Sequence, residues 1–421
     1  MALIVQKFGG SSVADPAGMK RVAHKIAEAH RGGNQVVVVV SAMGDTTDEL
    51  IDLTQEITKN PPKREMDILL TAGERISMSL LAMAVNEEGV PAKAFTGQQA
   101  GLITDTEYGN ASIINVDPAR IIETLDAGFV AIIAGFQGVN KRNDVTTLGR
   151  GGSDTTAVAF AAALDADMCE IYTDVDGVFS ADPRIVHAAS QMKTITYEET
   201  LELAAHGVKV LHLRAVEYAR KFNVPLHVRS SFSTKEGTKI VEGTDMNGEY
   251  EGPAVVGVAH DLNQGKISVV GVPNTPGVAA KIFSCVAKAD GNIDMIVQNT
   301  PLTRTGISNI SFTVPRQDVS IVVKALEANK EELGFEKIAV ENEIGILSVV
   351  GAGMRTYTGV SAKLFNTLGG LGINVDMIST SEIRISVVLD PKDITRAAIA
   401  VHSAFGLDSE EEAIVYGGTG R

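Results

Sequence analysis

The chain has little cysteine and little positive charge, and both shortages narrow what it can do. Its 421 residues include two cysteines, Cys169 and Cys285, so neither a disulfide framework nor a cysteine-based zinc site is expected. Lysine and arginine number 37 against 52 aspartates and glutamates, and the resulting net charge of −15 repels nucleic acids and anionic membranes. We therefore expect no nucleic-acid or membrane partner, and any anionic ligand needs a local basic site.

Several common sequence signals are also missing. The first ten residues lack the basic and apolar regions of a signal peptide, and no apolar run approaches the roughly 20 residues of a membrane span. The eight histidines are scattered, so no metal held by protein ligands is expected, and the GxSxG elbow of hydrolases is absent. The GxxxxGK[ST] and GxGxxG nucleotide motifs do not occur either. The first absences favour a cytoplasmic protein. The others argue against a hydrolase and show that any nucleotide must be bound by a less common motif.

The first part of the chain has the pattern of an α/β fold. From residue 1 to about 245, short β-branched runs alternate with helical stretches, which is typical of a mostly parallel sheet covered on both faces. The clearest strand is Gln35–Ser41, where five consecutive valines indicate burial on both sides, and Phe129–Ala134 and Met168–Thr173 are similar. Asp15–His30 has helical spacing and packs on this sheet in our interpretation. We expect an αβα sandwich.

The second part of the chain is a duplication. The polar, glycine-rich segment Val241–Gly252 marks a boundary, and beyond it Lys266–Gly271 recurs as Ile346–Gly351. Gly277–Ile296 matches Gly359–Ile378 at roughly nine of twenty positions. A period of about 80 residues fits a duplicated small domain of strand, loop, helix and strand. The predicted units are residues 1–245, a linker at 246–264, and two copies at 265–343 and 344–421.

The first strand-like run ends in a segment suited to an anion. Lys7-Phe8-Gly9-Gly10-Ser11-Ser12 follows that run directly, and a helical pattern comes next. Two glycines between a strand and a helix let backbone amides approach an anion, and Lys7 adds a positive charge beside them. The segment predicts a phosphate cradle, with an ordinary glycine turn as the alternative.

Polar residues also follow the other predicted strands, where open α/β sheets bind their ligands. Ser41 and Thr47 come after the five-valine strand, although a threonine there is equally a helix cap. Glu74 lies in a helical stretch that begins near Arg64, where a lone glutamate usually faces solvent. These residues are candidates for binding a small polar molecule.

The densest segment is Leu148–Thr156. Three glycines flank Arg150, and Asp154 opens an alanine-rich helix, so one turn offers amides, a guanidinium and a carboxylate. An aspartate at a helix start is usually a cap, yet Asp154 is also suited to hydrogen-bond Lys7 and hold it toward a transferring phosphate. The polar loop Thr173–Arg184 is long enough to wrap a purine and ribose, although turn chemistry alone explains its Asp-Gly and Asp-Pro pairs.

Together these segments resemble the aspartate kinase family in order and spacing, over essentially the whole chain. The motifs are KFGGSS at 7–12, SAMGDTTD at 41–48, GER at 73–75, TLGRGGSDTTA at 147–157, TDVDGVFSADPR at 173–184 and KVLH at 209–212. The duplicated unit resembles the paired, ferredoxin-like ACT domains that follow the kinase domain in this family. GRGGSDTTA together with tandem ACT units is highly specific.

The resemblance implies ATP-dependent phosphorylation of the β-carboxylate of L-aspartate, giving 4-phospho-L-aspartate, with Mg²⁺ carried by the nucleotide. This reaction is the first step towards lysine, threonine, methionine and diaminopimelate. A carboxylate acceptor is already ionised at pH 7, so positioning and charge neutralisation suffice for catalysis. Two alternatives are a kinase acting on glutamate or acetylglutamate, and an amino-acid sensor without catalysis.

The resemblance also assigns roles to residues. Lys7 would contact the transferring phosphate and Asp154 would orient Lys7; Arg150 would bind the α-carboxylate of aspartate and Glu74 its α-amino group. The aspartate site would comprise Ser41, Thr47, Glu74, Arg150 and Gly151. The nucleotide site would comprise Lys7, Gly9, Gly10, Ser11, Thr173, Asp174, Phe179, Arg184 and Lys209.

Regulation is expected in the ACT-like copies, as feedback inhibition by lysine, threonine or both. A dimer interface alone is the alternative. The expected effector residues are Asn274, Gly277, Ala279, Asn292, Asp294, Gln298, Val360, Ser361, Asn374, Val375, Ser381 and Glu382. The final strand-like run, Glu412–Tyr416, is expected to pair back with the first copy. A homo-oligomer is implied, or an α/β hetero-oligomer whose smaller subunit starts internally, for which Met246 stands in the boundary.

Overall fold

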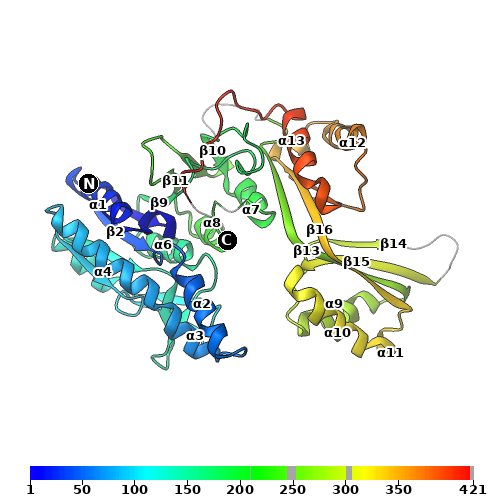
Figure 1. The fold of residues 1–421 in the computed structure, drawn as a ribbon, viewed down its shortest axis with the longest axis horizontal. Helices are drawn as coiled ribbons and strands as arrows, with labels where there is room; N and C mark the ends of the chain where they lie inside the picture. Colours follow the sequence, from blue (N-terminus) through cyan, green and yellow to red (C-terminus); the bar gives the residue numbers. More distant parts are fainter. Residues whose placement is uncertain (209, 244–252, 300–305, 418–421) are drawn as a thin grey trace.

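A computed structural model describes residues 1–208, 210–243, 253–299 and 306–417. The N-terminal half is an α/β domain and the C-terminal half is a separate antiparallel sheet with its own helices, as Figure 1 shows. The expected fold class is confirmed.

The central sheet of the N-terminal domain is mostly parallel. Its order in the described chain is β10-β12-β11-β9-β1-β2-β6-β3, and β1 pairs in parallel with β9 on one side and β2 on the other. The bounds are β1 Leu3–Phe8, β2 Gln35–Val40, β3 Ala92–Phe95, β6 Val130–Ala134, β9 Met168–Thr173, β10 Thr194–Thr196, β11 Leu226–Ser230 and β12 Thr238–Val241. The carboxyl ends of β9, β1 and β2 therefore lie side by side at one edge.

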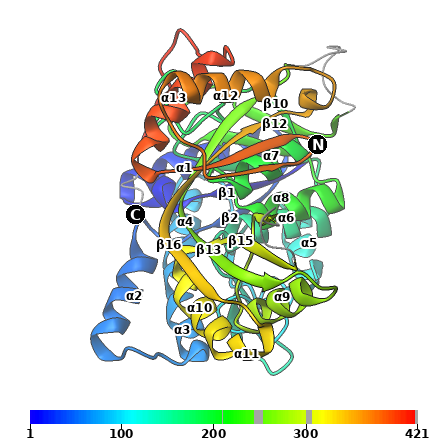
Figure 2. The same cartoon turned by 90° about the vertical axis from the view of Figure 1, so that its right-hand side faces the viewer.

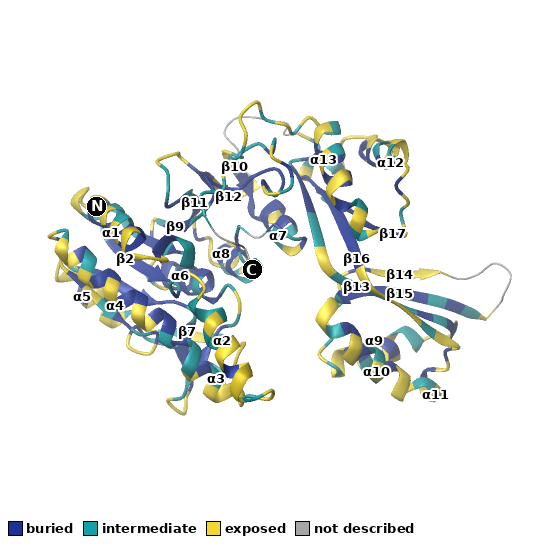
Figure 3. Ribbon diagram, in the orientation of Figure 1, coloured by how far each residue is buried: buried dark blue, intermediate teal, exposed yellow. Residues whose placement is uncertain are grey.

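Two apolar layers enclose this sheet, one on each face. The five valines of β2 alternate between these layers. Val36 and Val38 pack with α1 (Pro16–Arg31) and α4 (Ala72–Glu87), whereas Val37 and Val39 pack on the side of α5, α6 and α8. Figure 3 shows the sheet buried between helices whose outer faces are exposed. The other helices of the domain are α2 Thr46–Ile57, α3 Lys63–Leu70, α5 Ala119–Asp126, α6 Gly152–Ala163, α7 Tyr197–Ala205 and α8 Leu213–Phe222.

A small second sheet lies beside the central one. Its order is β5-β4-β7-β8, with β4 at Leu102–Thr104, β5 at Ile113–Val116, β7 at Gln137–Val139 and β8 at Val145–Thr147. β8 leads directly into the glycine-rich segment before α6. This sheet therefore fixes one end of that segment.

One segment of the N-terminal domain has the length of a membrane span, although charged residues interrupt it. Within the described ranges, Lys63–Glu87, which joins α3 and α4, is long and apolar enough to cross a membrane by length and composition alone. In the structure its inner side contributes Leu81 and Val85 to the core and carries the buried Glu74. These contacts identify the segment as a packed helix of the α/β domain.

The C-terminal half is one antiparallel sheet in the order β14-β15-β13-β16-β18-β17. Its strands are β13 Gly257–Pro273, β14 Ile296–Asn299, β15 Ile307–Pro315, β16 Lys337–Val350, β17 Met377–Thr380 and β18 Arg384–Leu389. Its helices are α9 Val278–Lys288, α10 Val319–Ala328, α11 Lys330–Leu333, α12 Val360–Gly370 and α13 Ile394–Ala404. The duplication is visible, because α9 and α12 both start after a left-handed glycine, Gly277 or Gly359.

The two copies share their long strands, which Figure 2 shows running between the helices of one copy and those of the other. Residues 266–270 of β13 pair with 337–341 of β16 in the first copy, and residues 257–261 of β13 pair with 346–350 of β16 in the second. The predicted linker at 246–264 is therefore partly wrong, because residues 257–264 belong to β13.

The prediction that Glu412–Tyr416 pairs with the first copy is wrong. The free edge of β13 in that copy is already filled by residues 337–341. The final run instead reaches the N-terminal domain, where Val415 forms an antiparallel bridge with Val175 and the Tyr416 amide donates to the Asp174 carbonyl at 2.9 Å.

Candidate active site

The structure brings together Lys7, near the end of β1, and Asp154, in the first turn of α6. The distance from Lys7 Nζ to Asp154 Oδ1 is 2.6 Å, and their side chains are only 12% and 10% exposed. An ion pair shielded from water holds both groups more firmly than a surface pair does. The ammonium is therefore fixed at the edge where the parallel strands end.

The glycines after Lys7 allow three loops to meet. A Cβ atom on Gly10 would lie 2.9 Å from the Ala42 carbonyl oxygen, so the loop after β1 can approach the loop after β2 only because residue 10 is glycine. On the other side, the Gly9 amide donates to the Tyr172 carbonyl of β9 at 3.3 Å. Ser11 lies in the short helix Gly10–Val13 that follows. The segment predicted as a phosphate cradle thus joins the ends of three neighbouring strands.

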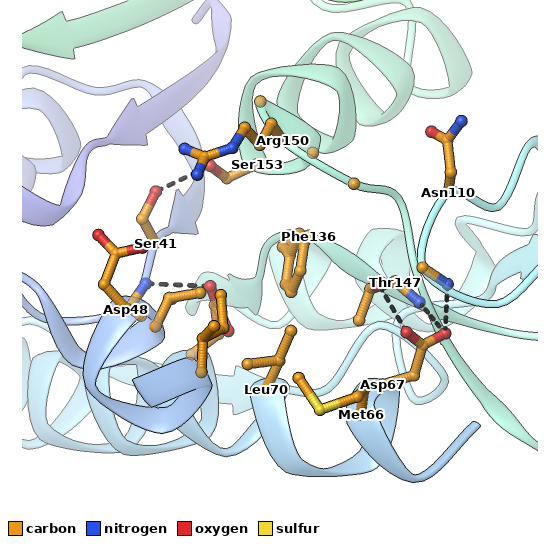
Figure 4. A pocket seen from close by; sticks show the side chains of 18 of the residues that line it. Ser41, Asp48, Met66, Asp67, Leu70, Asn110, Phe136, Thr147, Arg150 and Ser153 are labelled. Carbon is orange, nitrogen blue, oxygen red and sulfur yellow. Dashed lines mark hydrogen bonds between the residues drawn. The ribbon is translucent and has the colours of Figure 1, made fainter. Parts of the chain in front are cut away.

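A cavity of about 610 Å³ opens beside this cradle. All five residues predicted for the aspartate site line it, together with Gly10: Ser41, Thr47, Glu74, Arg150 and Gly151. The Oγ atoms of Ser41 and Ser153 lie 2.8 Å apart, and Figure 4 shows the Arg150 guanidinium on the same side of the cavity as these two serines. The cavity therefore has a cationic side that suits a carboxylate.

Glu74 supplies an acidic group to the same cavity. Its side chain is buried, with the residue 3% exposed, and its Oε1 accepts the Ala42 amide at 3.1 Å. Its Oε2 is buried and has no hydrogen-bond partner in the described part of the chain. Burial raises the pKa of Glu74 to about 7, although the Ala42 amide opposes this shift. A buried carboxylate oxygen without a partner suits a cationic ligand group such as an ammonium.

Asp67 on α3 is a cavity residue that sequence reasoning missed. It is 1% exposed and accepts hydrogen bonds from the Thr147 amide at 2.9 Å, the Thr147 hydroxyl at 2.8 Å and the Gly109 amide at 3.0 Å (Figure 4). Burial raises its pKa in spite of these bonds. Asp67 thus anchors the end of β8, from which the Arg150 segment continues. Its surrounding sequence, KREMDILL, is that of an ordinary amphipathic helix and carries no signal.

Position 151 requires glycine for two reasons: its backbone is left-handed, and the His212 side chain leaves no room for a Cβ atom. Its φ is +68°, and a Cβ atom there would lie 2.0 Å from Cγ of His212. We expect Gly151→Ala to lower the free energy of unfolding by about 2 kcal/mol or more, of which roughly 1 kcal/mol is the left-handed backbone and the rest the clash. Gly128→Ala is the control, because Gly128 has φ +80° with nothing near its Cβ position. Equal losses in urea denaturation of the two variants would contradict the clash.

A second, smaller cavity of about 170 Å³ lies at the end of β9. Four residues predicted for the nucleotide site line it: Thr173, Asp174, Phe179 and Arg184. Arg184 Nη2 is 3.3 Å from Asp174 Oδ2, so an ion pair joins the start of the loop after β9 to a residue ten positions further along it. Lys209 lies outside the described residues, between Val208 and Val210, which also line this cavity.

Strand order explains how the two cavities relate to Lys7. The larger cavity uses the loop after β2 and the smaller one uses the loop after β9, and β1 lies between these strands. Lys7 therefore stands between the two cavities. Among the residues that the structure describes, no three His, Cys, Asp or Glu side chains are grouped to hold a metal ion.

The residues predicted to bind an effector fall into two related sets. Those of the first copy lie around the start of α9 and around β14, and those of the second lie around the start of α12 and on either side of β17. β14 and β17 contact each other, and Met295 and Met377 share one buried cluster. The two sets are thus brought near each other within one chain.

Two of these residues contact the N-terminal domain. Asp294 Oδ1 lies 3.6 Å from Nε2 of His206, and the Ser381 hydroxyl donates to Glu202 at 3.4 Å. Burial would raise the pKa of Asp294, but the hydrogen bond to His206 and the electrostatic interactions with His206 and Arg384 hold it below its ordinary value. Both contacts reach the end of α7, so the predicted effector region is joined directly to the α/β domain.

Comparison with known proteins agrees with this architecture. The model of the amino acid kinase family matches residues 2–230, and that of the ACT domain matches residues 267–329 and 347–405. The aspartokinase of Mycolicibacterium smegmatis is 56% identical over 422 residues, covering 100% of both chains.

Two solved structures of E. coli aspartokinase III share the fold. The structure with aspartate and ADP (R-state) has a TM-score of 0.81 at 24% identity, covering 96% of this chain and 99% of that one. The structure with lysine and aspartate (T-state) has a TM-score of 0.71, also at 24% identity, with the same two shares covered. The relative that matches over its full length is an aspartokinase, and the amino acid kinase and ACT domain models match the two halves of the chain. The chain therefore belongs to the aspartokinase family.

Proposed function

We propose that this enzyme transfers the γ-phosphoryl group of ATP, bound with Mg²⁺ as part of the substrate, to the β-carboxylate of L-aspartate in the cytoplasm. The products are 4-phospho-L-aspartate and ADP. The observation that carries the proposal is the place of Lys7, paired with Asp154 on the strand between the two cavities. In this reading residues 1–245 form the kinase domain, and the two ACT domains follow.

The larger cavity supports an amino acid with a free ammonium as the acceptor. The unpartnered Oε2 of Glu74 would pair with the α-amino group, and Arg150 would pair with the α-carboxylate. N-acetylated acids lack the ammonium and would leave Glu74 buried without a partner. ADP release measured with aspartate, glutamate and N-acetylglutamate as acceptors tests this choice, since activity on the acetylated acid would refute it.

The smaller cavity supports binding of the nucleotide. Thr173, Asp174, Phe179 and Arg184 offer hydroxyl, carboxylate, aromatic and guanidinium groups at the end of β9, next to Gly9 and Gly10. A nucleotide held there would direct its phosphates along the glycine amides toward Lys7. E. coli aspartokinase III, which shares the fold, has been solved with aspartate and ADP.

Catalysis then needs no general base, because the attacking carboxylate is already ionised near pH 7. Lys7 would neutralise charge on the transferring phosphoryl group. Asp154 would keep the ammonium in place, since it fixes Lys7 at 2.6 Å. The glycine amides would supply further donors to the phosphate oxygens.

The rate at low aspartate concentration should depend on pH through Glu74. In the free enzyme burial raises the pKa of Glu74 to about 7. Below that pH the carboxyl is protonated and cannot pair with an ammonium, so kcat/KM for aspartate should fall about tenfold per pH unit, whereas above it kcat/KM should level off. Glu74→Gln should remove this inflection. A pH profile of kcat/KM that is unchanged in Glu74→Gln would contradict the assignment.

We also propose feedback control at the ACT domains by lysine, threonine or both, in a homo-oligomer or an α/β hetero-oligomer. An amino acid that paired its ammonium with Asp294 would compete with His206 for that carboxylate, and so would alter the contact with α7. One solved relative, E. coli aspartokinase III, is in complex with lysine. Met246, the candidate internal start, lies outside the described residues. Initial rates with each amino acid, alone and together, would identify the inhibitor.

A further inference from the structure

The last described residues of the chain form a strap across the loop that follows β9. This C-terminal strap, residues 407–416, comes after α13 of the second ACT domain and returns to the kinase domain (Figure 1). Four of its backbone connections with the loop come before Tyr416: Asp408 bridges Ala189, the Ser409 amide donates to the Ala188 carbonyl at 2.7 Å, the Ala413 amide donates to the His187 carbonyl at 3.1 Å, and Val415 bridges Val175. The strap therefore follows the loop over much of its length.

Tyr416 contacts a residue that lines the nucleotide cavity. Its amide donates to the carbonyl of Asp174, and its hydroxyl donates to Asp176 Oδ2 at 3.2 Å. Its ring stacks on Phe232 with 5.9 Å between centroids and an angle of 5° between the planes. Asp176 is 1% exposed and also binds Lys235, so Tyr416 completes a buried polar cluster under the loop.

A second connection reaches the loop through a buried histidine. His402 on α13 is 0% exposed; its Nε2 lies 2.7 Å from the Ser180 hydroxyl, and its Nδ1 lies 2.7 Å from Asp408 Oδ1. Ser180 is 1% exposed and so cannot meet a substrate, which excludes a hydrolytic role for this Ser-His-Asp arrangement. Its effect is to tie the loop to α13 and to the strap.

Three of the connections from the strap and α13 fall on residues that line the nucleotide cavity or flank its lining. Tyr416 and Val415 hold Asp174 and Val175, which line the cavity. His402 holds Ser180, which stands between the lining residues Phe179 and Ala181. The larger cavity has none of these residues in its lining. Displacement of the strap would therefore alter the nucleotide cavity and leave the aspartate cavity in place.

We infer that Tyr416 is a positioning residue for ATP: the C-terminal strap holds the loop after β9 in the shape that binds the nucleotide. The inference rests on the proposed placement of ATP at Thr173–Arg184. Because the strap begins at the end of an ACT domain helix, it also gives the regulatory half of the chain a direct mechanical contact with the nucleotide site.

The test is steady-state kinetics of the full-length enzyme with ATP and aspartate varied separately. We expect Tyr416→Ala to raise KM for ATP about tenfold, while KM for aspartate changes less than twofold. Tyr416→Phe keeps the ring stack and the backbone contact, so its KM for ATP should rise only about two- to threefold. Glu412→Ala is the matched control, because Glu412 is an exposed strap residue.

Arg184→Ala separates this inference from the proposed site. If Arg184→Ala raises KM for ATP but Tyr416→Ala leaves it within twofold, the positioning role is refuted. A rise of both KM values by the same factor in Tyr416→Ala refutes it too, since that pattern indicates general loss of structure. If Arg184→Ala does not change KM for ATP, the proposed nucleotide site is itself wrong. Should Tyr416→Ala fail to fold, Tyr416→Phe decides by the same comparison of KM values.

Discussion

Replacing Lys7 with alanine should lower kcat by about 10³-fold or more, because the variant loses the cation fixed between the two cavities. The ammonium is held by Asp154 at 2.6 Å and is largely shielded from water, so its charge acts on the phosphoryl group at short range. Binding of aspartate should change little, since Lys7 does not line the larger cavity. ADP release under saturating substrates measures the effect.

Lys20→Ala is the control for this variant, because Lys20 is exposed on α1. A double-mutant cycle with Asp154→Asn adds a second check. If Asp154 acts by orienting Lys7, Asp154→Asn should cost about 10- to 100-fold alone and almost nothing further in the Lys7→Ala background. Additive losses would show that Asp154 acts independently, and a Lys7→Ala enzyme within tenfold of wild type would contradict the role given to Lys7.

Replacing Glu74 with glutamine should lower kcat/KM for aspartate by about 100-fold. The change keeps the size of the side chain and an acceptor for the Ala42 amide, but it removes the charge that would meet the ammonium in a buried site. The KM for ATP should stay within twofold, because Glu74 lines the larger cavity and not the smaller one. Steady-state kinetics with each substrate varied in turn separates the two constants.

Glu87→Gln provides the comparison, since Glu87 is exposed at the end of the same helix. It removes an equal charge at a place far along α4 and should leave both constants unchanged. A Glu74→Gln enzyme with normal kcat/KM for aspartate would refute the pairing of Glu74 with the α-amino group. A loss shared equally between aspartate and ATP would point to damage of the fold instead.

The parts of the fold that follow from local pattern were predictable. The five valines of β2 occur as a buried central strand, and the Asp15 side chain caps α1 by accepting the Gly18 amide at 2.7 Å. The repeated segments form matching helices after Gly277 and Gly359. In each case the residue types and their spacing restrict the backbone strongly, so the sequence needs no distant contact to specify the element.

The parts that depend on distant contacts were not predictable. Residues 257–261 join the second ACT copy because they pair with β16, about 90 residues further on, and nothing in their own sequence indicates that partner. The run Glu412–Tyr416 was given the wrong neighbour, since its Val415 forms an isolated bridge with Val175, in a loop of the N-terminal domain. The propensity of a segment to form a strand does not determine its partner. The partner is determined by which sheet edges in the fold are still unpaired.

The candidate site shows the same division. The ion pair of Lys7 and Asp154 was proposed from the two motifs, whose residue types complement each other. The burial of Glu74 was uncertain from sequence, because a glutamate in a helix usually faces water and only tertiary packing turns it into the cavity. Asp67 escaped notice for the same reason: its three donors come from Thr147 and Gly109, which are far from it in the chain.

Trapping the product with hydroxylamine tests the central claim most directly. The enzyme would be incubated with ATP, Mg²⁺, aspartate and hydroxylamine, and the hydroxamate would be identified by mass spectrometry against both isomers. The proposed reaction predicts aspartate β-hydroxamate, formed only when ATP and aspartate are both present and nearly absent with Lys7→Ala. Formation of the α-hydroxamate, or no hydroxamate from aspartate under any condition, would contradict phosphoryl transfer to the β-carboxylate.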